Sequence, residues 1–175
     1  MKDKSIVPTH VERTMRDGDF IVSKTNTKGQ LTYCNRIFIE FSGYSEAQLL
    51  GQQHNIVRHP HMPRSIFHLL WSRIQSGEEI FAYVKNMHAD GSFYWVYANV
   101  TASLDLNGNI VGYYSVRRKP STKAMATIPA LYDEIYAEEQ RHPSKDQLNA
   151  GATFLNTKLS ELGISYDHFV YQLQG

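Results

Sequence analysis

The chain has 175 residues, with 18 Lys and Arg against 17 Asp and Glu, 8 His and one Cys. A chain of this length folds as one domain, or as one domain with a helical appendage, and has a core large enough to enclose a small ligand. The balanced charge argues against nucleic-acid binding, and the 42% of hydrophobic residues excludes a disordered chain.

Cysteine usage and the N-terminal sequence indicate a protein of the cytoplasm. Cys34 is the only cysteine, so no intrachain disulfide can form, and we expect a reducing compartment. The first eight residues carry charge and lack an apolar run of signal-peptide length. No stretch of the sequence approaches the roughly 18 consecutive apolar residues of a membrane-spanning helix. We therefore expect a soluble, cytoplasmic protein without a membrane segment.

The first third of the chain predicts a hairpin followed by short helices. Residues 1–19 are polar and mixed in charge, which predicts an N-terminal cap that is either loose or dependent on a partner. A strand-like run starts at Phe20, turns at Gly29 and continues over residues 30–35 as a second strand. Short helical signals follow, and Ser45 is placed to cap a helix over the next five residues.

A loop and one amphipathic helix come next. Pro60 and Pro63 hold residues 51–63 in turn and extended geometry. Apolar residues over 66–74 recur at the spacing of one helix face, and the helix should end at Gly77. We expect this helix to lie across a sheet.

Three further strands form an antiparallel meander. They are predicted over residues 80–87, 92–103 and 109–117, with turns at Asp90-Gly91 and Asn107-Gly108. The order of strands and helices therefore predicts an α+β fold, in which one five-stranded antiparallel sheet carries short helices on one face. Such a fold leaves space for a ligand between its layers.

Residues 121–175 are predicted to form a helical C-terminal extension. Leu148, Leu155 and Leu162 recur at heptad spacing, which indicates a seam that binds a partner or a second subunit. The extension is too apolar for a free linker and too short for a second domain, so it should pack on the sheet or on a partner. The predicted organisation is a cap at 1–19, a domain at 20–120 and the extension.

A set of short motifs runs through residues 20–120, comprising Tyr33-Cys-Asn-Arg-Ile-Phe38, Ser42-Gly-Tyr-Ser45, Gly51-Gln-Gln-His-Asn-Ile-Val-Arg-His-Pro60, Val84-Lys-Asn86, Gly91-Ser-Phe-Tyr-Trp-Val96 and Gly112-Tyr-Tyr-Ser-Val-Arg117. The set resembles the PAS sensory domains, and more closely the flavin-binding PAS domain of the bacterial aerotaxis (energy taxis) receptors. This resemblance implies a PAS fold and a non-covalent FAD held between helices and sheet, whose redox state sets the signal.

The resemblance also assigns a candidate cofactor site. The cofactor contacts that it implies lie at Arg58, His59, Asn86 and Tyr94, and His61, Asn55 and Trp71 complete the candidate set. Two positions depart from the family pattern. His61 stands where an acidic residue is common, and Ile80 stands where Trp is common.

Several of these side chains have chemistry that suits a flavin. The Arg58 guanidinium can donate to a pyrophosphate or to the pyrimidine edge of the ring, although a surface ion pair would also explain it. Asn86 lies in mid-strand, where its amide can match the donors and acceptors of the flavin edge or be satisfied by backbone. Tyr94 and Trp95 point to opposite faces of their strand. Family likeness makes Tyr94 the pocket residue and leaves Trp95 to pack under the C-terminal helices or a partner chain.

The same residues also suggest other kinds of site. A single histidine could bind haem, with His88 and the cluster at His54, His59, His61 and His68 as the contenders. A metal site is not predicted, because the cluster lacks cysteines and paired short spacings. Residues 54–59 contain no Cys, which disfavours the light-driven thiol adduct of photoreceptor PAS domains. No nucleotide-binding or catalytic pattern rises above chance.

The sequence therefore predicts a cytoplasmic redox or oxygen sensor that binds FAD and has no enzymatic activity. Reduction of the flavin would change the hydrogen bonds required of Asn86. The sensor would signal in trans to a protein partner, or as a homodimer, through the N-terminal cap or the C-terminal helices. The alternatives are a haem-binding PAS gas sensor and a cofactor-free PAS interaction module.

Overall fold

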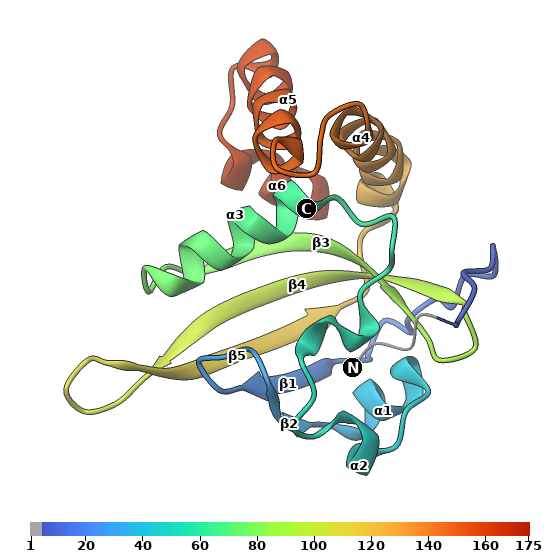
Figure 1. The fold of residues 1–175 in the computed structure, drawn as a ribbon, viewed down its shortest axis with the longest axis vertical. Helices are drawn as coiled ribbons and strands as arrows, with labels where there is room; N and C mark the ends of the chain where they lie inside the picture. The colour runs from blue at the N-terminus through green and yellow to red at the C-terminus, as the bar shows by residue number, and fades with distance from the viewer. Residues whose placement is uncertain (1–4) are drawn as a thin grey trace.

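The computed structural model describes residues 5–175 and contains a five-stranded antiparallel sheet in the order β2-β1-β5-β4-β3 (Figure 1). The predicted α+β fold is confirmed, with strand ends that differ from the prediction by one to a few residues. Phe20, the predicted first strand residue, precedes the sheet and is half exposed. The strands are β1 (Ile21–Thr25), β2 (Leu31–Cys34), β3 (Ile80–Met87), β4 (Phe93–Leu104) and β5 (Ile110–Arg118).

Strand pairing gives the sheet two different faces. β3 and β4 pair without a bulge from Ile80 opposite Val100 to Met87 opposite Phe93. Because side chains alternate along a strand, Asn86 points to the opposite face from its neighbours on β3. We call the face with Asn86 the inner face and the face with the side chains of Tyr83 and Trp95 the outer face.

Four helical segments connect β2 to β3: α1 (Arg36–Ser42), α2 (Glu46–Leu49), the 3-10 helix η1 (His54–Val57) and α3 (Arg64–Gln75). Asn35 caps α1 by accepting a hydrogen bond from the Phe38 backbone, and Ser45 caps α2 as its sequence predicts. α3 contacts β3 and β4, and its apolar side chains are buried against them. These segments therefore cover the inner face.

The C-terminal extension consists of α4 (Thr122–Gln140), α5 (Gln147–Leu162) and α6 (Tyr166–Gln174). The Trp95 and Tyr132 ring centroids lie 5.7 Å apart, and the Tyr132 hydroxyl donates a 2.9 Å hydrogen bond to the Tyr83 carbonyl. The Tyr83 hydroxyl in turn donates to the Val170 carbonyl of α6. The extension thus covers the outer face at β3 and β4, as predicted for Trp95, while α5 packs against α3.

This packing corrects the predicted leucine seam. Leu155 is buried within the chain itself, as is Leu159, and Leu148 faces a cavity described below. Only Leu162 of the three predicted seam residues is strongly exposed, at 60%. The prediction that the three leucines form one continuous surface for a partner is therefore wrong. Their heptad spacing reflects the packing of α5 on α3 and α4.

The N-terminal segment is tied to the start of β4. Thr9 donates to the Gly91 carbonyl, Arg13 donates to the Phe93 carbonyl, and both backbone hydrogen bonds are shorter than 3 Å. Met15 is buried in the core. The expected looseness is therefore wrong for residues 9–15, because the extended backbone of residues 9–13 pairs with the sheet and Met15 lies in the core. Residues 1–4 of the predicted cap lie outside the described residues. Among the helices of residues 5–175, none is both long and apolar enough to cross a membrane.

Candidate functional site

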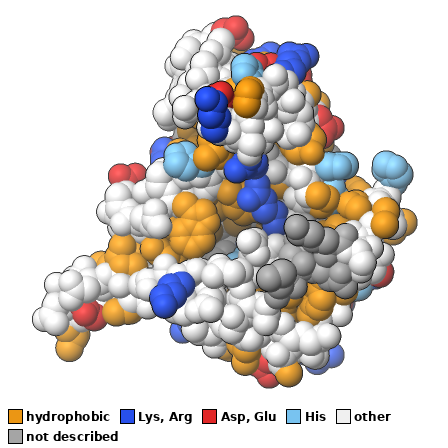
Figure 2. Space-filling view, in the orientation of Figure 1, with side chains coloured by type: hydrophobic (Ala, Val, Ile, Leu, Met, Phe, Trp, Pro, Cys, Tyr) orange, Lys and Arg blue, Asp and Glu red, His pale blue; other side chains and the backbone are white. Residues whose placement is uncertain are grey.

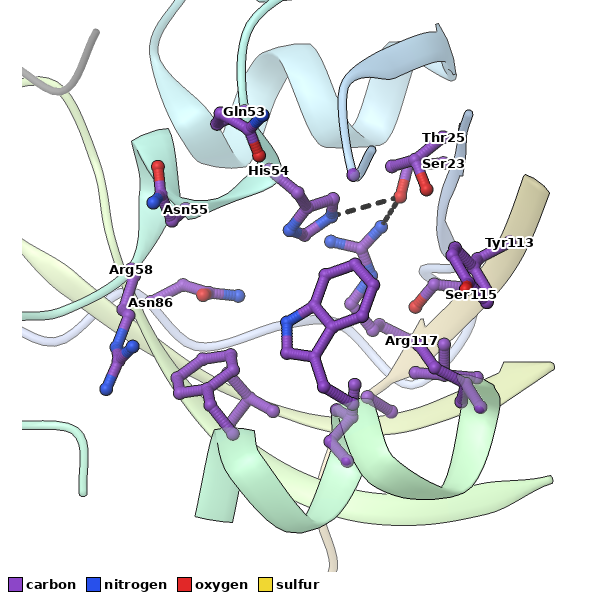
Figure 3. Close-up of a pocket in the computed structure, with 18 of the residues that line it drawn as sticks. Ser23, Thr25, Gln53, His54, Asn55, Arg58, Asn86, Tyr113, Ser115 and Arg117 are labelled. Atoms are coloured by element: carbon purple, nitrogen blue, oxygen red, sulfur yellow. Dashed lines mark hydrogen bonds between the residues drawn. The ribbon is translucent and has the colours of Figure 1, made fainter. Parts of the chain in front are cut away.

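A cavity of about 360 Å³ lies between α3 and the inner face (Figure 3). Its volume falls within the roughly 300–1,000 Å³ that is usual for small-molecule sites. The apolar part of its lining comes from α3, β3, β4 and β5 with Leu148 of α5, and the polar part comes from β1, η1 and the residues on either side of it, α3, β3 and β5. The apolar lining includes Phe67, Leu70, Trp71, Ile74, Val84, Ala98, Val100 and Tyr113.

Aromatic side chains shape one wall of the cavity. Trp71 of α3 meets Tyr113 of β5 edge to face, with ring centroids 5.4 Å apart and planes at 90°. A Cβ atom added to Gly29 would lie 3.0 Å from the Trp71 ring, and Gly29 has a φ of +75°. The backbone of the β1–β2 turn therefore packs directly against the Trp71 ring and holds this ring at the edge of the cavity.

Arg117 supplies a buried positive charge to the lining. Its side chain is 2% exposed, its guanidinium lies 4.8 Å from the centroid of the Phe38 ring, and Nη2 donates to the Ser23 hydroxyl. Within the described part of the chain, Arg117 Nε and Nη1 have no hydrogen-bond partner. Burial lowers the pKa of Arg117 to about 10, so the group keeps its charge at neutral pH. A buried cation with two unused donors is suited to a ligand with hydrogen-bond acceptors.

His54 is held neutral beside this cation. Its Nε2 lies 3.2 Å from the Ser23 hydroxyl, and Figure 3 shows Ser23 between His54 and Arg117. The Ser23 oxygen accepts from Arg117, and its own hydrogen can be donated to His54 Nε2 in the tautomer that carries the ring proton on Nδ1. Burial and the charge of Arg117 lower the pKa of His54 to about 3. The polar end of the cavity therefore carries one fixed positive charge.

A second polar group comes from the loop after η1 and from β3. The backbones of Arg58 and Asn86 form an isolated antiparallel bridge, which ties this loop to the sheet. The Arg58 guanidinium packs 4.1 Å from the Phe67 ring centroid, and Nη2 donates to the Met62 carbonyl. Burial lowers the pKa of Arg58 to about 10. Figure 3 shows Arg58, Asn55 and Asn86 on the opposite side of the cavity from Ser23.

The cavity brings together four of the seven predicted contacts, namely Asn55, Arg58, Trp71 and Asn86. The other three are His59, His61 and Tyr94. His59 is buried against Phe93, and His61 lies 5.4 Å from the Tyr136 ring of α4. Tyr94 points inward as predicted, but it packs edge-on against Phe41 under α1, and its hydroxyl has no partner among the described residues. Contact between these seven residues and a cofactor stays a prediction.

Residues that the sequence analysis did not assign to the site complete its lining. Arg117, Ser23 and Tyr113 were absent from the candidate set, and His54 was weighed only as a haem ligand. One signal could have found Arg117. It follows Tyr113 and Ser115 at a spacing of two, so strand alternation puts all three on the same inner face.

The remaining histidines and Ile80 have other surroundings. His68 lines the cavity together with His54, whereas the His88 ring lies 2.8 Å from Asp90 in the turn between β3 and β4. Ile80 is 1% exposed and belongs to the core. Across residues 5–175, no three His, Cys, Asp or Glu side chains are grouped so that they could hold a metal ion.

A family model described as the PAS fold matches residues 31–117. The chain belongs to the PAS family. This PAS chain is 34% identical over 129 residues to the aerotaxis receptor of Escherichia coli K12, a match that covers 74% of the chain and 25% of the receptor. It is also 29% identical over 97 residues to the nitrogen fixation regulatory protein of Klebsiella pneumoniae, covering 55% of the chain and 20% of that protein. The predicted likeness to aerotaxis receptors is confirmed, and the chain spans about a quarter of that receptor's length.

Solved structures support the same fold. A Light-Oxygen-Voltage domain studied with a flavin analogue superposes with a TM-score of 0.55 at 24% identity, covering 66% of this PAS chain and 87% of that chain. The dark structure of the Aureochrome1 LOV photoreceptor gives a TM-score of 0.53 at 24% identity, with 70% and 83% covered. At this level of identity the likeness establishes the fold alone.

Proposed function

We propose that this PAS domain binds a flavin non-covalently in the cavity and acts as a cytoplasmic redox or oxygen sensor. The observation that supports this proposal most strongly is Arg117, a buried cation with two donors unused by the described residues of the chain. FAD is the flavin implied by the likeness to the aerotaxis receptor.

The cavity lining fits an isoalloxazine ring. Trp71 and Phe67 offer flat apolar surface, and the edge of a flavin pyrimidine carries acceptors for Arg117. Asn86 has both a donor and an acceptor for the same kind of edge. Arg58 stands across the cavity, where its guanidinium can neutralise a phosphate.

The side chains at the polar end of the cavity determine how the site would respond to negative charge added to a bound flavin. A bound flavin supplies reversible uptake of electrons, which adds negative charge to its ring. Arg117 remains protonated at neutral pH and stabilises negative charge placed beside it. His54 stays neutral, and Asn86 can exchange donor for acceptor by rotating its amide. The resulting change in hydrogen bonds is the signal that we propose, passed to a protein partner or a second subunit without a catalytic step.

Absorption spectroscopy of the purified chain tests the class of cofactor. We expect a flavin spectrum and FAD released by denaturation. A Soret band would instead support haem, for which His54 and His68 are the cavity histidines, although His54 Nε2 is bonded to Ser23. A colourless protein that takes up neither FAD nor FMN would overturn the proposal and favour a cofactor-free interaction module.

Arg117→Met tests the proposed anchor. Hydrogen bonds to a charged group contribute about 1.5–3 kcal/mol, so flavin affinity should fall about 10- to 150-fold in a fluorescence titration. Arg118→Met is the matched control, because Arg118 lies next in β5, is exposed, and packs against Tyr97 on the outer face. Asn86→Ala should also weaken flavin retention. Full affinity in both Arg117→Met and Asn86→Ala would show that the site is assigned wrongly.

A further inference from the structure

A carboxylate of the C-terminal extension caps the helix that lines the cavity. α3 begins after Pro63, whose ring has no group that can accept a hydrogen bond from the first turn. Glu139 of α4 takes this role: its two oxygens accept from the backbone of Arg64 at 2.9 Å and of Ser65 at 2.8 Å. The Ser65 hydroxyl donates a third bond at 2.7 Å. A negative charge at a helix N-terminus with three donors is a strong, directional contact. We call Glu139, Arg64 and Ser65 the latch.

The latch is buried and closely fitted to α5. Glu139 is fully buried, although carboxylates are rarely buried unless they are paired. A Cβ atom added to Gly151 of α5 would lie 2.6 Å from both Glu139 Oε1 and the Ser65 hydroxyl. Three helices therefore meet at one point, and none of them can shift there without breaking contacts of the other two.

The same helices reach the cavity. Arg64 belongs both to the latch and to the cavity lining, and its Nη1 donates to Gln147 Oε1 at 2.9 Å and to the Ser144 hydroxyl at 3.3 Å. Leu148, the next residue of α5, lines the cavity directly. Figure 2 shows Lys or Arg side chains at the hollow where the C-terminal helices meet the rest of the domain. A ligand in the cavity can therefore contact the extension only while α5 is docked on α3.

We propose that occupancy of the cavity and docking of the C-terminal extension are coupled through the Glu139 latch, so that the extension is the element that reports the bound state. A ligand that gains contacts with Leu148 and Arg64 stabilises the docked extension. Because coupling between two equilibria is reciprocal, a ligand that favours the docked extension binds more weakly to a chain that has lost the latch and whose extension undocks. The identity of the ligand as a flavin rests on the proposed function, whereas the coupling rests on the helices alone.

Hydrogen exchange of the full chain without ligand is the first test. In Glu139→Ala we expect faster amide exchange both in the first turn of α3 and in α5, compared with the wild type. Glu139→Gln keeps one acceptor oxygen, so this variant should show a smaller rise in exchange in the same two helices. It thereby distinguishes loss of the latch from general unfolding. Glu134→Ala is the matched control, because Glu134 also lies on α4 and bonds Lys158 of α5, but on the exposed side. A rise confined to one of the two helices, or an equal rise in Glu134→Ala, overturns the proposal.

Flavin titration is the second test. Saturating FAD or FMN should slow exchange in α5 of the wild type, and Glu139→Ala should bind either flavin about 5- to 150-fold more weakly, the range usual for coupled sites. Unchanged affinity in Glu139→Ala overturns the coupling. If the wild type binds neither FAD nor FMN, the flavin proposal fails by itself, and the exchange measurement without ligand still decides whether the latch connects α3 to α5.

Discussion

The two faces of the sheet at β3 and β4 satisfy their polar groups in different ways. On the outer face, the hydroxyls of Tyr83 and Tyr132 both find acceptors within the chain. On the inner face, Arg117 and Tyr94 carry buried polar atoms that have no partner among the described residues. The outer side therefore leaves one neutral hydroxyl, that of Tyr166 on α6, without a partner among the described residues, whereas the inner face leaves three such atoms, two of them on the charged guanidinium of Arg117.

This difference indicates how the two faces divide their roles. An unused buried charge costs more folding free energy than an unused neutral hydroxyl, so the Arg117 donors favour a ligand site on the inner face more strongly than the Tyr166 hydroxyl does on the outer side. Saturated contacts between aromatic side chains instead stabilise the fold. Substitutions on the outer face should therefore act mainly on stability, and substitutions on the inner face mainly on ligand binding or on pH dependence.

Trp95→Ala should give the largest effect. Trp95 is 7% exposed and packs on Tyr132 of α4, and removal of a buried Trp side chain costs about 3–5 kcal/mol of unfolding free energy. Denaturant titration measures the loss. Phe81→Ala is the control on the same face, because Phe81 is 38% exposed and should cost much less. Equal losses in the two variants would break the comparison.

The inner face should show a pH dependence that comes from His54. Its folded pKa of about 3 lies below the roughly 6.5 of an unfolded histidine, so between these values the unfolded chain binds the extra proton. Stability contributed by the neutral ring is complete above pH 6.5 and is lost as the pH falls toward 3, by about 1.4 kcal/mol per pH unit. His54→Gln cannot titrate. The difference in unfolding free energy between the wild type and this variant should therefore shrink on acidification, and a difference constant with pH contradicts the assigned neutral state.

Tyr94→Phe should give the smallest effect, and it sharpens the comparison most. The Tyr94 hydroxyl is buried without a partner among residues 5–175, so its removal should leave stability unchanged or raise it by about 1 kcal/mol. Flavin affinity measured in the same variant decides whether the hydroxyl contacts a ligand. An unchanged affinity removes Tyr94 from the predicted contacts, whereas a clear loss shows that it reaches the cofactor.

The fold could be read from the sequence because its signals are local. The strand-like run over 80–87 and the Asp90-Gly91 turn predict β3 and its hairpin with β4, and Ser45 predicts the start of α2. The N-terminal segment could not be read in this way. Its hydrogen bonds go to Gly91 and Phe93, about eighty positions later, and nothing in a polar sequence specifies such a partner.

Part of the cavity lining could be predicted from family motifs. Asn86 and Arg58 lie in motifs shared with a known family, and both line the cavity. Arg117 was missed although it ends one of these motifs, because its burial depends on Ser23 and Phe38 from other elements. Glu139 was missed for the same reason, since the donors that explain a buried carboxylate belong to a helix 75 positions earlier.

The turn between β4 and β5 is a suitable position for a fluorescent label on the domain. It projects away from the helices (Figure 1), Leu106 at its tip is fully exposed, and Asp105 accepts backbone hydrogen bonds from Asn107 and Asn109 that keep the tip ordered. Cys34 is buried, and burial raises the pKa of its thiol, so it competes poorly for a maleimide reagent. A fluorophore attached through Leu106→Cys would thus report from a single known point without touching the cavity or the extension.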